Sequence, residues 1–138
     1  MEDEKRIEMV RRAMAAVARR DTAAFLAEVA EDCELRPLMS VWPQPYRGHE
    51  GIERWFEDLA SVWDSFSVEP HDIRALDDDT LLVELLWKGR GKGRRDELFG
   101  PAVALWRFRD DKAVSARLYP DEATALEAYE AGDETDSS

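Results

Sequence analysis

Histidine and cysteine side chains could carry chemistry in this chain, but they are few and far apart. His71 lies between Pro70 and Asp72, and its imidazole could act as a pocket base because histidine titrates near neutral pH. An exposed or structurally satisfied histidine is the simpler interpretation of that position. His49 and Cys33 give no metal-ligand spacing with it, so we expect no metal site. No glycine-rich phosphate loop joins a strand to a helix, and we expect no cofactor.

Aromatic side chains indicate a binding pocket more clearly than any acid–base pair does. Trp42 and Tyr46 lie in a loop with two prolines, whereas Trp87 and Trp106 lie on long apolar runs. Aromatic walls favour flat apolar ligands, although the same rings could fill a closed core. The expected partner is a small apolar or polycyclic molecule. The predicted ligand-binding residues are Trp42, Tyr46, Leu85, Trp87, Ala104 and Trp106.

A basic cluster stands out in residues 88–95 of this acidic chain. It consists of Lys88, Arg90, Lys92, Arg94 and Arg95. Such a cluster suits an anion site or a contact with an acidic partner. A solvated turn that limits pairing of the sheet edge is the simpler alternative.

The overall charge and the cysteine count exclude several classes of partner. A formal net charge of −12 repels nucleic-acid phosphates and anionic membranes, so we expect neither as a partner. Cys33 is the only cysteine, and the acidic N-terminus does not resemble a signal peptide, which predicts a cytoplasmic protein. The length of 138 residues suits one domain. We place that domain at residues 1–131 and expect a disordered acidic tail at 132–138.

Apolar residues at helical spacing predict three helices in the first half of the chain. The first covers residues 4–19, and the second follows Asp21, which can cap it. A strand at 33–38 and a loop at 39–47 come next. The third helix covers residues 48–63, with an apolar stripe made of Ile52, Trp55, Phe56, Leu59 and Trp63.

Apolar runs and turn residues predict a sheet in the second half. Its strands lie at residues 66–76, 80–88, 97–109 and 113–119, and Pro70 makes the first of them an edge strand or a bulged one. A last helix begins at Asp121. Both faces of the two longest strands are largely apolar, so both should be covered. The chain's own helices can cover one face, and we expect a second copy or another partner on the other.

This order of elements resembles the NTF2-like superfamily, in particular its SnoaL-like and ketosteroid-isomerase-like branch. The segments that carry the resemblance are Arg20-Asp21, residues 30–35, residues 46–52, residues 106–112 and residues 117–121. The resemblance implies an α+β cone, in which a strongly curved, mostly antiparallel sheet wraps around three helices, with a short C-terminal helix. It also implies a pocket at the open end and, in many relatives, dimers formed through the outer face of the sheet.

The resemblance also allows a comparison of catalytic positions. The tyrosine, the basic aspartate and the protonated aspartate of ketosteroid isomerase fall at Ala13, Pro37 and Ala104, so we expect no ketosteroid isomerase activity. Asp121 stands about where some cyclase relatives carry an acid, but it also precedes Glu122 in a good helix-capping position. The catalytic candidates are therefore His71 and Asp121 alone.

Alternation along the strands separates an inner face from an outer one. The resemblance places the sets containing Trp87 and Trp106 on the pocket side. It places Val114, Ala116 and Leu118 inside on the last strand. The outer face is then apolar at its centre, at Leu82, Leu86, Val103 and Leu105, and charged at its rim, at Glu84, Lys88, Arg107 and Arg117. Such a face predicts a homodimer.

Two interpretations remain open from the sequence. The first is a SnoaL-like small-molecule pocket protein, and if it is an enzyme, it is a cofactor-independent cyclase, isomerase or hydrolase. The second is a non-catalytic, dimeric binding or interaction module. The absence of an identifiable acid–base pair favours the second interpretation, and the aromatic residues support the first.

Overall fold

The computed structural model describes residues 2–37 and 45–131, with the side chains of Glu2 and Asp3 left aside. Trp42, most of the predicted 39–47 loop and the predicted tail at 132–138 lie outside this range. The elements are α1 (Glu2–Arg19), α2 (Thr22–Leu26), β1 (Val29–Arg36), β2 (Tyr46–Arg47), α3 (Gly48–Val62), β3 (Trp63–Asp77), β4 (Thr80–Gly91), β5 (Glu97–Arg109), β6 (Lys112–Tyr119) and α4 (Glu122–Glu130).

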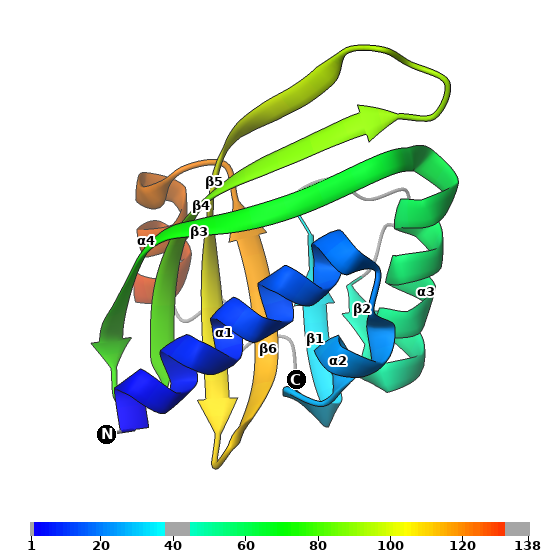
Figure 1. The fold of residues 1–138 in the computed structure, drawn as a ribbon. Helices are drawn as coiled ribbons and strands as arrows, with labels where there is room; N and C mark the ends of the chain where they lie inside the picture. The colour runs from blue at the N-terminus through cyan, green and yellow to red at the C-terminus, as the bar shows by residue number, and fades with distance from the viewer. Residues whose placement is uncertain (1, 38–44, 132–138) are drawn as a thin grey trace.

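The strands form one six-stranded curved sheet in the order β2-β1-β6-β5-β4-β3 (Figure 1). Every neighbouring pair is antiparallel except β1 and β6, which run parallel. Helices α1, α2 and α3 lie against one face, and α4 packs on the other (Figure 1). This arrangement confirms the predicted α+β cone. No helix within the described residues is long and apolar enough to cross a bilayer.

Strand β3 forms the edge of the sheet, and its pairing with β4 shifts between Pro70 and Asp72. Proline cannot donate to a neighbouring strand, so an edge position with an irregular register suits it. Both consequences predicted from Pro70 are confirmed.

The inner face of the long strands follows the predicted alternation. Leu81, Val83 and Leu85 of β4 belong to the core, as do Ala104 and Trp106 of β5. On β6 the prediction for Val114 is wrong. The register shifts there, so that Arg107 pairs with Ser115 but Phe108 pairs with Ala113. This bulge places Ala113, instead of Val114, in the core.

The outer face is covered differently from the prediction. Leu82, Val103 and Leu105 are buried within the single chain, because Ala125 of α4 packs on them. The expectation that this apolar centre needs a second chain is therefore wrong. The period-2 pattern identified the face correctly, but it could not show that α4 folds back over it. Leu86, farther along β4, stays half-buried.

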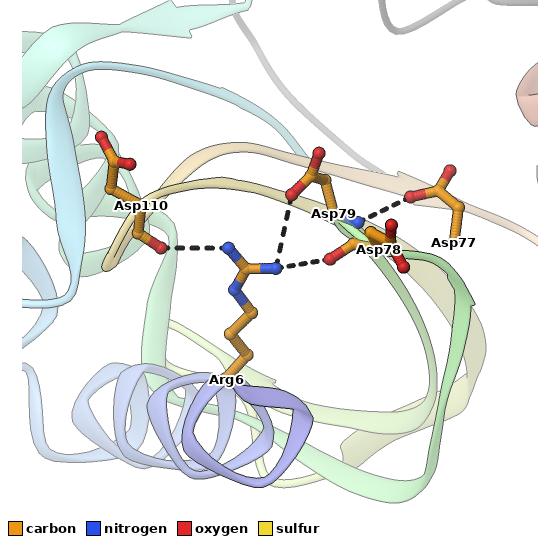
Figure 2. Close-up of polar contacts among 5 residues, drawn as sticks. All are labelled: Arg6, Asp77, Asp78, Asp79 and Asp110. Carbon is orange, nitrogen blue, oxygen red and sulfur yellow. Dashed lines mark hydrogen bonds and ion pairs between the residues drawn. The ribbon is translucent and has the colours of Figure 1, made fainter. Parts of the chain in front are cut away.

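Arg6 of α1 ties together two turns at one end of the sheet (Figure 2). Its guanidinium donates to the carbonyl oxygens of Asp78, at 2.6 Å, and Asp110, at 3.0 Å, and lies 3.5 Å from the Asp79 carboxylate. It also sits over the Phe108 ring, 5.1 Å from the centroid. Only 7% of the side chain is exposed. One buried cation thus joins the β3–β4 turn, the β5–β6 turn and the first helix.

Cys33 of β1 is buried in the core, and burial raises the pKa of its thiol from 9.0 to about 12. Between these values the folded state keeps a proton that the unfolded state has released, so stability falls as pH rises above about 9. The slope from this one thiol approaches about 1.4 kcal/mol per pH unit. We expect urea unfolding at pH 8, 9.5 and 10.5 to show that slope in the natural chain and to lack it in Cys33→Val. Parallel pH profiles for the two proteins would contradict this.

Candidate functional site

A cavity of about 80 Å³ lies between the inner face of the sheet and the helices. Six of its wall residues come from helices α1 to α3 and strand β1, Pro37 follows β1, and the other nine come from β3 to β6. They are Met14, Val17, Phe25, Leu35, Pro37, Trp55, Leu59, Trp63, Phe66, Val68, Leu85, Trp87, Ala104, Trp106, Ala116 and Leu118. Pro37 marks the end of the described chain before residue 45.

The chemistry of this wall is uniform. Each of its described residues is aliphatic, aromatic, methionine or proline, and none can ionise. Binding in such a cavity is favourable because it removes the apolar surfaces of the wall and of the ligand from water. It offers a bound molecule no general acid or base from the described wall.

A buried aromatic group forms the inner part of the wall. The Phe25 ring lies 6.0 Å from Trp55, 5.5 Å from Phe56 and 6.4 Å from Trp106, measured between centroids, and the interplanar angles are tilted or edge-on. Rings prefer such arrangements over face-to-face stacking, and close packing holds each in one rotamer. Phe25, Trp55 and Trp106 of this group line the cavity, whereas Phe56 does not.

A second aromatic group, Trp63, Phe66 and Trp87, is only half-buried. Phe66 and Trp87 stack at 6.5 Å with a 20° interplanar angle. Two glycines make room for these rings. A Cβ at Gly89 would lie 2.8 Å from the Trp63 ring, and a Cβ at Gly100 would lie 3.2 Å from Trp87 Nε1. The rings can therefore lie directly on the strand backbone.

Four of the six predicted ligand-binding residues, Leu85, Trp87, Ala104 and Trp106, line the cavity. Whether they bind a ligand stays a prediction. Tyr46 is not part of the wall: it is buried in β2, and its hydroxyl donates to Asp58 Oδ2 at 2.6 Å. Trp42 lies outside the described residues.

Neither predicted catalytic candidate reaches the cavity. His71 is exposed on the irregular stretch of β3. Asp121 caps α4 by accepting a hydrogen bond from the Thr124 amide at 2.8 Å, and that bond lowers the pKa of its carboxyl. His49 lies in the first turn of α3, with Nε2 3.3 Å from the Val29 carbonyl oxygen. Within the described residues, no cluster of three potential metal ligands occurs.

The cone, its inner cavity and the order of its elements agree with the family comparison. Residues 10–116 match the SnoaL-like domain family. The chain belongs to this family. A search of curated protein sequences found no significant match.

Solved structures similar to this SnoaL-like chain share its fold at low sequence identity. A protein with a ketosteroid isomerase-like fold from Catenulispora acidiphila, in complex with trimethylamine, is 20% identical and has a TM-score of 0.71. That match covers 81% of this chain and 84% of the other. TerC, co-crystallised with polyporic acid, is 21% identical over 89% of this chain and 96% of its own, with a TM-score of 0.74. Bal32a, from a soil-derived mobile gene cassette, is 19% identical over 86% and 91%, with a TM-score of 0.75.

The positions carried over from ketosteroid isomerase fall in different places in this SnoaL-like chain. Pro37 and Ala104 both line the cavity, whereas Ala13 is buried in α1 and is not part of the wall. Two of the three positions therefore face the cavity, and neither has a side chain that can exchange a proton.

Sequence reasoning missed the half-exposed end of the SnoaL-like cavity. Trp63 fitted the helical stripe of α3, but the helix ends at Val62 and Trp63 begins β3. The predicted strand at residues 80–88 stops just before Gly89, although β4 continues to Gly91. One indication of this end of the cavity was a large residue placed opposite a small one: Phe66 of β3 lies opposite Gly89 of β4.

Proposed function

We propose that this SnoaL-like protein binds a small, flat, apolar molecule in the cavity. One observation carries the proposal: the wall holds four tryptophans, Trp55, Trp63, Trp87 and Trp106, and no ionisable side chain among its described residues. Specific small-molecule sites are typically apolar and largely preformed. The fixed rings around Phe25 suit that description.

Size limits the ligand class. The cavity measures about 80 Å³, whereas an engineered apolar cavity of about 150 Å³ accommodates benzene. A single ring fits only if the half-buried group of Trp63, Phe66 and Trp87 shifts outward, and a polycyclic molecule needs a larger shift. The relatives solved with trimethylamine and with polyporic acid support the view that this fold holds small organic molecules. Trimethylammonium is therefore a useful comparison probe, since aromatic rings attract such cations.

The first prediction concerns the volume left by an alanine. In the natural chain, a bound apolar dye should quench tryptophan fluorescence and toluene should raise Tm, because a ligand at about 100 times its Kd stabilises the fold by about 2.7 kcal/mol. Ala104→Leu fills the cavity and should abolish both effects. Ala123→Leu, at an exposed position of α4, is the matched control and should behave as the natural chain does.

Two results would refute the pocket proposal. One is a natural chain whose Tm no apolar ring compound raises. The other is an Ala104→Leu variant that binds as the natural chain does. If trimethylammonium raises Tm and toluene does not, the proposed ligand class changes from neutral to cationic.

Binding without catalysis is the form of this proposal that the wall favours, because proton transfer needs a positioned acid or base. We continue to expect no ketosteroid isomerase activity. Cytoplasmic location also stays a prediction, based on the lone Cys33 and the acidic N-terminus.

The alternative function is a dimeric binding or interaction module, and a specific observation favours pairing with a second copy. Beyond α4, the outer face carries a strip formed by Leu86, Phe99 and Pro101, where Leu86 pairs with Pro101. Phe99 is 69% exposed. Charges of both signs flank the strip, as in the Lys88–Glu69 pair. Mixed charges around an apolar strip suit an isologous interface, in which each patch meets itself.

The second prediction tests this strip. Phe99→Glu should leave the fold intact and convert the dimer to a monomer, because it places a charge in the apolar centre of the interface. Leu98→Glu is the control: Leu98 is 55% exposed, but as the neighbouring strand residue it points to the other face. Light scattering at micromolar concentration measures both. A natural chain that is monomeric under these conditions would rule out the dimer.

A further inference from the structure

The inner face of the sheet continues past the cavity onto a hairpin formed by the end of β4 and the start of β5. Residues 97–102 of β5 pair with β4 but lie beyond the end of β6, whose pairing with β5 stops at Val103. Side chains alternate along a strand, so Gly89 and Gly91 of β4 face the same side as Trp87, which lines the cavity. The inner face of this hairpin therefore adjoins the half-exposed end of the cavity.

Apolar side chains extend the cavity wall onto the hairpin. The Trp63 ring lies on Gly89, and Leu98 of β5 is paired with Gly89, so both side chains lie on the inner side. Trp63 is half-buried, and Leu98 is 55% exposed. The hairpin thus offers an apolar surface in contact with water directly outside the cavity. A ligand longer than the cavity can lie along this surface.

One cation lies on the same face of the hairpin. A Cβ at Gly91 would lie 3.6 Å from Cγ of Arg94 and 3.7 Å from its Cδ, so the aliphatic stem of Arg94 covers Gly91 on the inner side. Gly91 is paired with Trp63 of the neighbouring strand. Arg94 is exposed, and its side chain makes no ion pair or hydrogen bond with any residue that the structure describes. Its guanidinium is therefore available at the rim of the cavity.

Two backbone hydrogen bonds hold the turn that carries Arg94 in place. The Lys92 amide donates to the Val62 carbonyl oxygen at 3.1 Å, at the end of α3. The Gly93 amide donates to Asp64 Oδ2 at 3.2 Å, at the start of β3. The turn is thus joined to the segment that supplies one side of the half-exposed end, which keeps the cation and the aromatic rings close together.

The hairpin is locally positive, although the chain has a net charge of −12. Residues 88–97 hold the five cations of the basic cluster and two carboxylates, Asp96 and Glu97. Arg20 adds a guanidinium that donates to the Asp64 carbonyl oxygen at 2.6 Å, and it offsets the carboxylate of the same residue. Charges more than about 10 Å away are largely screened at 0.1 M salt. An anion beside Arg94 is therefore attracted by its surroundings.

We propose that the ligand of the cavity is an apolar carboxylate, with its ring between the tryptophans and its carboxylate on Arg94. This inference rests on the proposed binding function and adds a charged head group to the ligand. A guanidinium presents parallel N–H groups that match the two oxygens of a carboxylate. Trp63, Leu98 and the stem of Arg94 contact the chain that joins the ring to the head group. Of the two interpretations of the basic cluster, the anion site then holds for Arg94.

Three probes with one apolar body and different head groups test the proposal. They are 4-phenylbutyrate, 4-phenylbutan-1-ol and 4-phenylbutylammonium, which are anionic, neutral and cationic at pH 7. Isothermal titration calorimetry in low salt measures each Kd. The acid should bind about fivefold more tightly than the alcohol, as one exposed charge pair allows, and the ammonium compound more weakly than the alcohol. In 0.5 M NaCl the preference for the acid should fall below about twofold.

Variants of the turn assign the preference to one side chain. Arg94→Gln should make the acid and the alcohol bind equally, and Arg94→Glu should make the ammonium compound the tightest of the three. Arg109→Gln is the matched control, because it makes the same charge change at the opposite end of β5, where exposed Arg109 pairs with Asp32. It should keep the preference of the natural chain.

The outcomes separate this inference from the pocket itself. If the alcohol binds and the acid binds no more tightly, the cavity still takes an apolar ring and the carboxylate is overturned. A full preference for the acid in Arg94→Gln overturns the role of Arg94. If toluene raises Tm but none of the three probes binds, the inference fails and the pocket remains. If toluene also has no effect, both proposals fail together.

Discussion

Leu105→Glu should prevent the chain from folding, which is a stronger effect than the loss of a dimer. Leu105 is 1% exposed, and it belongs to the cluster that Leu82, Val103 and Ala125 form under α4. Removing a buried leucine costs about 2–5 kcal/mol, and burying a carboxylate without a partner adds several more. Whole domains have a total stability of about 5–15 kcal/mol. Circular dichroism and thermal unfolding measure the outcome.

Phe99→Glu is the matched control for this variant, because Phe99 lies on the same strand and the same face but is exposed. It should keep the native spectrum. A folded Leu105→Glu variant with an unchanged Tm would show that α4 does not cover Leu105 in solution. Leu105→Met keeps the volume and should cost less than about 1.5 kcal/mol.

Arg6→Met should destabilise the fold by about 3 kcal/mol. Methionine keeps much of the apolar stem but loses the charged hydrogen bonds to the Asp78 and Asp110 carbonyl oxygens, each worth about 1.5–3 kcal/mol. The contact with Phe108 is lost as well. Water can reach part of the two turns after the substitution, so the loss of stability should be smaller than the sum of the hydrogen-bond contributions. Urea unfolding measures the difference in free energy.

Two further variants test whether the loss comes from the contacts of Arg6 with the two turns or from a general effect of charge. Arg12→Met removes an arginine from the same helix, but Arg12 pairs with Glu28 on the surface, so the change should cost at most about 1 kcal/mol. Arg6→Lys keeps the charge but loses the planar fork that reaches both turns at once, and it should fall between the two. Equal losses of unfolding free energy for Arg6→Met and Arg12→Met would contradict this role of Arg6.

Much of the fold could be predicted from the sequence because local patterns determined it. Helical spacing located α1 and α3, Asp21 and Asp121 capped the helices expected to follow them, and Pro70 marked an irregular edge strand. Each of these features depends on neighbours close in the chain. The paired strands β4 and β5 followed from simple alternation on both sides of a turn.

The rest depended on contacts between distant residues. The bulge that exchanges Val114 for Ala113 depends on how β6 meets β5, and period 2 alone does not show it. The position of α4 on the outer face depends on its packing against Leu82 and Leu105. The polar row of Arg107, Ser115 and Glu34 joins β5, β6 and β1 through register, so no sequence window contains it. For the same reason, the aromatic set found by sequence omitted Phe25 and Trp55, which reach the cavity from helices.

The parallel pairing of β1 with β6 has a consequence for how the chain folds. Glu34 and Arg117, which meet across this pair, are separated by 83 positions in the sequence. All strands of the β3–β6 meander can pair with a near neighbour as soon as each is made, but β1 and β2 have no place in the sheet until β6 exists. Contacts between distant residues slow folding because the chain entropy is lost before the contact forms. During synthesis, β1 must therefore wait for nearly the whole domain to leave the ribosome before it can join the sheet.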